Sequence, residues 1–332
     1  YDSLISKYDI DYDSVKIDKV FAMIDKEIIP KYKNIQKIKS PFIYKSDISD
    51  AKIIKEIKIK LQQLNFDFDR GRIDQSHHPF CGGATNDVRI TTRFEENILE
   101  SLSALFHETG HGVYEQNRPI QYLYEPLGQS RSLSVHESQS LFFENHIFKS
   151  QTYFKIINTI FDNSKDLEKS FLEHYHTVRI NPIRVSADEF SYPIHVFIRY
   201  QIEKEIFKNK IKFKDIKDLW NKKYLDHLEI DLISDSEGVL QDIHWYEGIF
   251  GYFPTYALGA MIASQIKYNC PLFDIFLKNP DEENINQLII WLNNNIHQKA
   301  SLYSSDEMLQ SISGEKLNSK YYLEHLVGRF VK

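Results

Sequence analysis

Two histidines with a glutamate beside the first form the most chemically specific pattern in the sequence. His107-Glu-Thr-Gly-His111 has the form H-E-x-x-H, and on a helix this spacing places both imidazoles on one face, one turn apart. Two ring nitrogens can then bind one metal ion, while Glu108 projects beside them and can accept a proton from a water molecule. Composition alone produces such a pattern with a chance on the order of a few per cent in a chain of this length. A third ligand is therefore needed to support a metal site.

A glutamate further along the chain offers that third ligand. Glu137 lies in His136-Glu-Ser-Gln139, after His111 and in another predicted helix. Two histidines and one carboxylate are a common ligand set of catalytic zinc sites, which leave one position open for water. His136, next to Glu137, is the alternative third ligand. The extension that would give a three-histidine set is absent, because the chain continues as Gly112-Val-Tyr-Glu-Gln-Asn117.

Two glycines interrupt the predicted motif helix. Gly110 and Gly112 each destabilise a helix by roughly 1 kcal/mol relative to alanine, which indicates that something packs closely against this turn. A substrate strand and a tightly crossing helix are the two alternatives.

Most of the chain has the apolar spacing of helices, which predicts a mainly α fold. The clearest stretches are Val20 to Ile29, Ile54 to Leu64 and Ile285 to Ile296. Helical periodicity resumes at Glu95 and carries the H-E-x-x-H motif, and another helix is predicted from Ser134 to Phe148.

Two regions break the helical pattern. Between Gly71 and Arg93, several glycines, a proline and the β-prone run Asp87 to Thr92 predict loops and short strands. A second stretch with Gly238, Gly248, Gly251 and Pro254 is predicted to be rich in loops. No repeat or convincing linker divides the chain, so we expect residues 1–332 to form a single domain.

Composition excludes several classes of protein. The chain has 41 Lys and Arg against 47 Asp and Glu, a formal net charge of -6, so nucleic acid is not expected as a partner. No stretch approaches the ~20 apolar residues that span a bilayer, so no membrane association is expected. The two cysteines, Cys81 and Cys270, have no metal-binding spacing and favour a reducing compartment, for which the cytoplasm is the expectation.

Taken together, the motifs resemble the carboxypeptidase Taq family of metallocarboxypeptidases, which remove single amino acids from the carboxyl ends of peptides. The resembling stretches, in order, are His78-Pro-Phe80, Asp87-Val-Arg-Ile-Thr-Thr92, His107-Glu-Thr-Gly-His111, His136-Glu-Ser-Gln139, Ile183-Arg-Val-Ser-Ala-Asp188 and Gly238-Val-Leu-Gln-Asp-Ile-His-Trp245.

The resemblance implies a zincin-like helical peptidase fold with a deep groove, a homodimer, and one zinc or cobalt ion per chain. His107, His111 and Glu137 would hold the metal, and Glu108 would be the general base. Family members are typically longer, so we expect part of their amino-terminal helical portion to be missing from this sequence.

Four further residues are candidates for binding substrate. Arg184 and His244 occupy motif positions that the family links to this role; a guanidinium can hold a carboxylate through two parallel hydrogen bonds, and an imidazole can donate to an oxyanion. The alternatives are a structural salt bridge of Arg184 with Asp188 or Glu189, and a core position for His244 with its hydrogen bonds satisfied.

The other two candidates are His78 and Tyr256. His78 precedes Pro79, which restricts its backbone to extended forms and could aim the ring into the groove; a simple loop histidine is the alternative. Tyr256, in preference to Tyr252, could donate its hydroxyl to a tetrahedral intermediate. Arg89 alternates with apolar neighbours as in a half-buried strand, so a structural role is expected for it.

The expected function is that of a metallocarboxypeptidase acting on peptides with a free terminal carboxylate. The nearest alternative is a zinc endopeptidase or oligopeptidase, which would lack a cationic anchor for that carboxylate. A peptide-binding protein without activity is the second alternative, and the intact Glu108 argues against it because a binder needs no general base.

Overall fold

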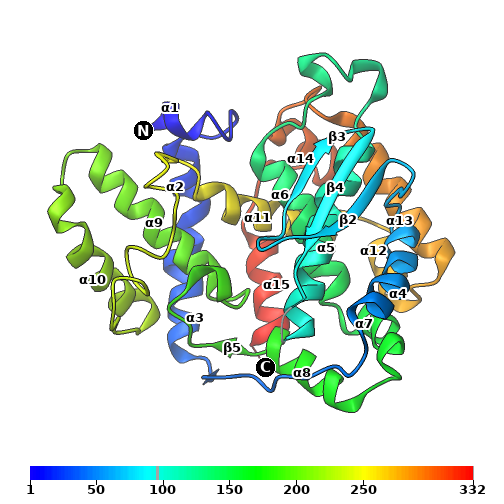
Figure 1. Cartoon of the computed structure of the whole chain (residues 1–332). Helices are drawn as coiled ribbons and strands as arrows, with labels where there is room; N and C mark the ends of the chain where they lie inside the picture. The colour runs from blue at the N-terminus through cyan, green and yellow to red at the C-terminus, as the bar shows by residue number, and fades with distance from the viewer. Residues whose placement is uncertain (95–96, 332) are drawn as a thin grey trace. The chain divides into compact units, whose positions relative to one another are not determined.

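The computed structural model describes residues 1–94 and 97–331 and is mainly helical, as predicted (Figure 1). The chain divides into two compact units, each built from segments that lie far apart in the sequence. Unit 1 comprises Tyr1–Pro41, Glu173–Met261 and Leu317–Lys332, and unit 2 comprises Phe42–Leu172 and Ile262–Lys316. In the described part of the chain, helices are too short or too polar to cross a membrane.

Unit 2 is organised around the helix that carries the H-E-x-x-H motif, α5 (Ile98–Gln116). The predicted start of this helix at Glu95 lies outside the described residues. Asn97 caps the described helix, because its side-chain oxygen accepts a hydrogen bond from the backbone of Leu99 at 3.2 Å. The helix buries side chains on several faces, since it packs against a sheet as well as against other helices.

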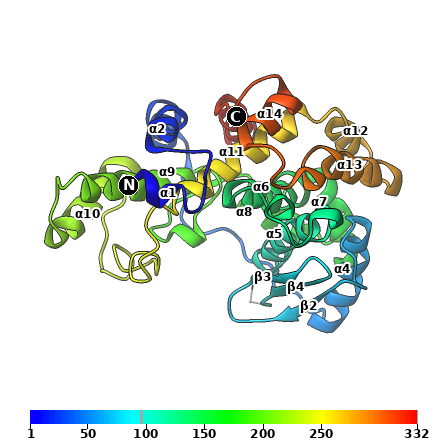
Figure 2. The same cartoon turned by 90° about the horizontal axis from the view of Figure 1, so that it is seen from above.

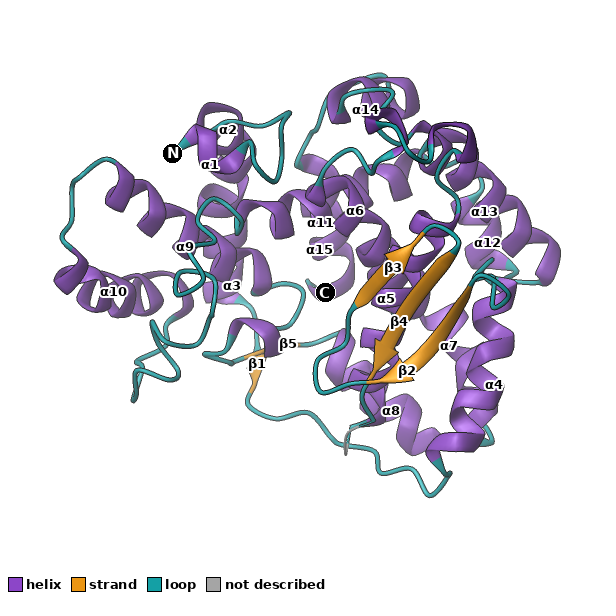
Figure 3. Cartoon of the chain, turned by 45° about the horizontal axis from the view of Figure 1, so that its top comes forward, coloured by secondary structure: helices purple, strands orange, loops and turns teal. Residues whose placement is uncertain are grey.

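The sheet of unit 2 confirms the short strands predicted between residues 71 and 93. Its order is β2 (Gly71–Gln75), β4 (Asp87–Thr92), β3 (Cys81–Ala84), with β2 parallel and β3 antiparallel to β4 (Figure 3). Val88 and Ile90 are buried against α5, whereas Arg89 is exposed and pairs with Asp87 at 2.8 Å. This alternation is the one expected for a half-buried strand.

The predicted helix from Ser134 to Phe148 is present but changes its winding. It begins as α6 (Leu133–Leu141), capped by Ser132, and continues as a π-helical segment, η4 (Phe142–Phe148). Apolar spacing did not predict this change, because a single wide turn alters the periodicity too little to be recognised. Wide turns of this kind are rare in proteins, and those that occur are frequently found at functional sites.

The remaining helices of unit 2 surround this centre, and α12 and α13 lie side by side (Figure 2). Their bounds are α4 (Asp50–Gln63), α7 (Gln151–Asn158), α12 (Phe273–Lys278), α13 (Glu282–Asn295) and α14 (Ser305–Ser313). Two further helices, α8 (Lys165–Tyr175) and α11 (Pro254–Asn269), contain residues at which the chain passes from one unit to the other.

Unit 1 is built on helices and one short parallel strand pair. The elements are α1 (Asp2–Ile5), α2 (Ser14–Met23), the π-helical η1 (Ile24–Ile28), α3 (Ile29–Asn34), β1 (Lys37–Ile38), β5 (Val178–Arg179), α9 (Tyr192–Phe207), α10 (Ile216–Leu228) and α15 (Lys320–Phe330). Helix α9 packs against α10 and η1. The stretch between α10 and α11 contains no helix or strand, as its glycines predicted.

The two glycines of the motif helix lie at close approaches. A Cβ on Gly110 would lie 2.4 Å from the carbonyl oxygen of Gln139 and 2.7 Å from the Cα of Ser140. A Cβ on Gly112 would lie 2.7 Å from the ring of Phe66. The tightly crossing helix, α6, is therefore what packs against Gly110, and a core phenylalanine packs against Gly112.

We predict that Gly110→Ala destabilises the protein by roughly 1–3 kcal/mol, the usual effect of overpacking. The added methyl group would meet backbone atoms of α6, which cannot turn away as a side chain can. Gly328→Ala is the control, because Gly328 lies inside α15 and a Cβ at this position would have no atom within 4 Å; that change should stabilise the helix by about 0.5–1 kcal/mol. Chemical denaturation of both variants tests the difference, and equal stability of the two would contradict it.

A buried carboxylate in unit 1 makes stability depend on pH. Burial raises the pKa of Glu203 to about 7, although hydrogen bonds from Trp245 and the backbone of Gly251 act in the opposite direction. The folded state therefore holds the proton more tightly than the unfolded chain, whose glutamates titrate near 4.5. The free energy of unfolding should consequently fall as the pH rises from about 4.5 to about 7.

We predict that Glu203→Gln removes this part of the pH dependence, because an amide stays neutral throughout the range. Midpoints of thermal unfolding at pH 5 and pH 8 should differ less for the variant than for the parent chain. Glu205→Gln removes a more exposed carboxylate from the same helix and should leave the parent's difference in place. An unchanged difference in Glu203→Gln would show that Glu203 is ionised in the folded protein over this range.

Candidate active site

Three side chains of unit 2 point their ligand atoms at one position. The Nε2 atoms of His107 and His111 lie 3.6 and 3.4 Å from Oε2 of Glu137, and the three donor atoms lie within 4.8 Å of one another. A tetrahedral site with bonds of about 2.0–2.2 Å separates its donors by roughly 3.3–3.6 Å. The residues on α5 and α6 therefore fit a metal ion of the size of zinc, and the close crossing at Gly110 makes this geometry possible.

The ring nitrogen of His107 that faces away from Glu137 is also held by a hydrogen bond. Nδ1 of His107 lies 2.8 Å from Oε2 of Glu144, and Glu144 is itself held by Ser103 and Lys149 at 2.8 and 2.7 Å. Because a carboxylate only accepts hydrogen bonds, Nδ1 of His107 carries a proton, and Nε2, which faces Glu137, is the nitrogen that can bind a metal once it is unprotonated.

His136, the alternative third ligand, contacts His111 at the ring nitrogen that does not face Glu137. Its Nδ1 lies 2.5 Å from Nδ1 of His111, and its Nε2 lies 2.8 Å from Oε1 of Glu115. Both ring nitrogens of His136 are thus engaged away from the cluster. His136 is not part of the metal-binding group found among the described residues.

The electrostatics of the cluster follow from burial and from its carboxylates. Burial alone would lower the pKa of His107, but Glu137 and Glu144 outweigh it and raise that pKa to about 10. Burial and the neighbouring His136 lower the pKa of His111 to about 4. Since a histidine binds a metal only through an unprotonated nitrogen, uptake of a cation here is coupled to release of a proton from His107.

Glu108 follows His107 on α5 and is buried. Burial raises the pKa of Glu108 to about 7; the charge of His107 counteracts this rise, and the carboxylates of Glu137 and Glu144 add to it. The Glu108 carboxylate thus interacts electrostatically with the residues of the cluster, and its role as general base stays a prediction.

His78 lies in the exposed turn between β2 and β3. Its carbonyl oxygen accepts a hydrogen bond from the hydroxyl of Ser76 at 2.5 Å, so the described contact of His78 is made by its backbone. A role of its ring in binding substrate stays a prediction.

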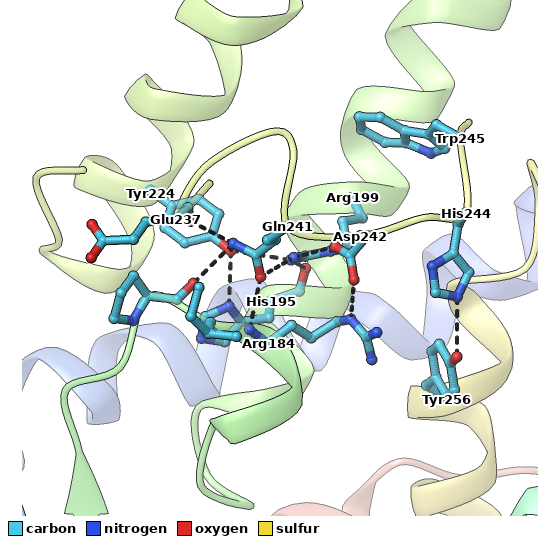
Figure 4. A network of polar contacts seen from close by, with 12 residues as sticks. Arg184, His195, Arg199, Tyr224, Glu237, Gln241, Asp242, His244, Trp245 and Tyr256 are labelled. Carbon is cyan, nitrogen blue, oxygen red and sulfur yellow. Dashed lines mark hydrogen bonds and ion pairs between the residues drawn. The ribbon is translucent and has the colours of Figure 1, made fainter. Parts of the chain in front are cut away.

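A second polar centre lies in unit 1 and contains Arg184, His244 and Tyr256 (Figure 4). Nε of Arg184 donates to Oδ1 of Asp242 at 2.9 Å, and Nε of Arg199 donates to Oδ2 of the same carboxylate at 2.6 Å. Both arginines hold the pKa of Asp242 below its usual range against the effect of burial.

The salt-bridge partners that the sequence suggested for Arg184 were wrong. Asp188 instead accepts hydrogen bonds from the backbone of Arg179 and from Ser191. Glu189 pairs with His325 and Arg329 on α15 at 2.7 and 2.6 Å. Asp242, which lies far along the chain in the loop before α11, could not be identified by proximity in sequence.

The charges of this second centre do not cancel. Arg184 and Arg199 are both buried and share the single carboxylate of Asp242. Burial and the nearby guanidinium groups lower the pKa of His195 well below its usual range and that of His244 to about 4, so neither histidine adds or removes charge near neutral pH. A buried excess of positive charge is costly without an anion, and this centre therefore favours binding of one.

His244 and Tyr256 lie beside Arg184. Nε2 of His244 is 3.1 Å from the hydroxyl of Tyr256, and the guanidinium carbon of Arg184 is 4.9 Å from the Tyr256 ring. Nδ1 of His244 is buried and has no hydrogen-bond partner in the described part of the chain. A core histidine with satisfied hydrogen bonds is thus not what the structure shows.

Several residues of these centres were missed in the sequence. Glu115 follows His111 by one helical turn, so helical spacing alone could have identified it. Glu144 lies in the π-helical turn, which that spacing did not predict. Arg199 offers no such signal, because it is one arginine in an otherwise ordinary helix.

Comparisons with known proteins identify the family of this chain. The family model of carboxypeptidase Taq (M32) metallopeptidases matches residues 1–330. Carboxypeptidase 1 of Bacillus subtilis is 36% identical over 99% of this chain and 68% of its own length. Thermostable carboxypeptidase 1 of Pyrococcus furiosus is 30% identical over 100% of this chain and 69% of its own length. The structure of Trypanosoma cruzi metallocarboxypeptidase 1 is 32% identical, with a TM-score of 0.87 over 100% of this chain and 72% of that one. The chain therefore belongs to the carboxypeptidase Taq (M32) family and is a metallocarboxypeptidase.

Proposed function

We propose that this protein releases single amino acids from the carboxyl ends of peptides, with Glu108 as general base. The observation that carries the proposal is the cluster of His107, His111 and Glu137, whose three donor atoms lie within 4.8 Å of one another beside a buried carboxylate. We assign zinc to this cluster, with cobalt as an alternative, because two histidines and one carboxylate suit either ion.

A divalent ion at this site supplies positive charge that acidifies water and polarises a peptide carbonyl. Glu108 accepts the proton of the attacking water and passes it to the nitrogen of the leaving amino acid. Glu144 keeps the ring of His107 in the orientation in which Nε2 faces Glu137.

Arg184 is proposed to hold the terminal carboxylate of the substrate. The buried positive excess that it shares with Arg199 and Asp242 supports this role. His244 would assist through its ring, Tyr256 would donate its hydroxyl to the tetrahedral intermediate, and His78 would contact the peptide from the exposed turn.

Three further expectations accompany the proposal: a homodimer, a cytoplasmic location, and substrates that are peptides with a free carboxylate. An endopeptidase would use the same metal cluster as the proposed carboxypeptidase, and a peptide-binding protein would use the same anion-binding centre.

Mass spectrometry of an amino-terminally blocked peptide separates the three functions. The peptide is incubated with the enzyme, with and without a chelator. Stepwise loss of residues from the carboxyl end, abolished by the chelator, supports a carboxypeptidase. An internal cut supports the endopeptidase, and an unchanged peptide supports the binding protein.

We predict that Glu108→Gln retains its metal but loses nearly all turnover, because an amide keeps the shape of the side chain yet cannot accept a proton from water. Metal content and rate are measured on the same preparation. Glu100→Gln changes an exposed glutamate of the same helix and should keep the parent rate. A rate for Glu108→Gln within about tenfold of the parent, ~1.4 kcal/mol of barrier, would mean that the base is another group.

We predict that Arg184→Ala lowers kcat/KM for free-acid peptides by roughly 2–4 kcal/mol, the usual effect of removing a buried charged partner. The same peptides with an amidated end, already poor substrates, should hardly be affected. Arg329→Ala removes another buried arginine of unit 1, one paired with Glu189, and should not discriminate between the two substrates. Equal slowing of both substrates by Arg184→Ala would assign Arg184 to structure or to the transition state.

A further inference from the structure

A chain of four polar side chains leads from the proposed metal cluster into the interior of unit 2. His111 contacts His136 at 2.5 Å, His136 contacts Glu115 at 2.8 Å, and Glu115 contacts Nη2 of Arg118 at 2.8 Å. Arg118 is buried and is anchored in turn by the carbonyl oxygen of Gly128 at 2.8 Å and the hydroxyl of Thr85 at 3.0 Å. We name these four residues, His111, His136, Glu115 and Arg118, the relay.

The far end of the relay fixes where each proton sits. Arg118 can only donate, and Glu115 is a carboxylate, because hydrogen bonds from His136 and Arg118 hold its pKa below the usual value despite burial. Nε2 of His136 must therefore carry the proton that it donates to Glu115. With its proton on Nε2, His136 can accept a hydrogen bond at Nδ1 from Nδ1 of His111, 2.5 Å away.

This assignment decides the tautomer of the proposed ligand. With its proton on Nδ1, His111 presents an unprotonated Nε2 toward Glu137, 3.4 Å away. The opposite tautomer of His136 would set the lone pair of Nε2 against the Glu115 carboxylate and would donate from Nδ1 to His111, whose metal-facing nitrogen would then carry the proton.

We propose that His136 is a positioning residue that fixes the tautomer of His111, with Glu115 and Arg118 holding His136 in turn, and that the relay thereby tunes the affinity of the cluster for its metal. This inference rests on the proposed metal site. It gives His136 a defined role in place of the ligand role considered from the sequence.

The two histidine ligands are supported in different ways. His107 donates directly to the carboxylate of Glu144, whereas His111 reaches a carboxylate only through the ring of His136. The nearest carboxylate on this side of His111 is therefore more distant, and His111 depends on the orientation of the intervening His136 ring. Loss of such an outer partner typically weakens metal binding by 10–100-fold.

The test measures zinc affinity by competition with a chromogenic chelator, and the visible absorption of the cobalt-loaded protein reports ligand geometry independently of activity. His136→Phe retains a ring but lacks the acceptor, and we expect its zinc affinity to fall by about 10–100-fold. His136→Asn places an oxygen near the position of Nδ1 and should recover most of that loss. Glu115→Gln should weaken binding less than His136→Phe, because it leaves the ring in place.

Two reference variants make the outcome decisive. His297→Phe removes another buried histidine beside the same tyrosine, Tyr114, at 5.3 Å from its ring, and disrupts hydrogen bonds to Asn293 and Gln139. It controls for loss of stability and should keep the parent affinity. Glu137→Ala removes the proposed third ligand and should weaken binding beyond any relay variant.

The possible results separate the relay from the metal site itself. Parent-like affinity in His136→Phe, or no recovery in His136→Asn, would overturn the relay while leaving the metal site intact. Retention of zinc by Glu137→Ala together with its loss from His136→Phe would instead make His136 the third ligand and overturn the proposed site. If His136→Phe does not fold, Glu115→Gln decides, and parent-like affinity there would contradict the role of the relay.

Discussion

The close crossing of α5 and α6 at Gly110 is the constraint on which the metal cluster depends. The H-E-x-x-H motif can place two imidazoles on one face of α5, but the third ligand must come from another element. Without a side chain at Gly110, the backbone of α6 approaches to within van der Waals contact. Glu137 on α6 then lies 3.4 and 3.6 Å from the two histidine nitrogens.

The two polar centres have opposite electrostatic character. In unit 2, Glu137 and Glu144 lie near His107, and Glu115 lies behind His136, so the surroundings of the cluster are rich in carboxylates. In unit 1, two buried guanidinium groups share one carboxylate. A cation suits the first centre and an anion the second, which matches the two charged partners, metal and terminal carboxylate, that the proposed reaction needs.

Sequence reasoning succeeded where the signal was local. The helices, the short strands between residues 71 and 93, and the neighbourhood of His107, His111 and Glu137 follow from periodicity and from one spaced motif. It failed for the ion-pair partner of Arg184, because Asp242 is distant along the chain and only the fold brings the two together. The role of His136 could not be predicted either, since the choice between ligand and outer partner depends on the angle at which α6 crosses α5.

The π-helical segment that follows α6 separates two functions of one continuous helix. Glu137 lies before the wide turn and Glu144 within it, so the first faces the metal side of His107 and the second faces its outer nitrogen. Each residue of an α-helix turns the chain by about 100°. In a regular α-helix, residues seven positions apart therefore lie only about 20° apart, on nearly the same face. The wide turn thus gives one continuous helix two differently directed contacts with the same histidine, one at each ring nitrogen.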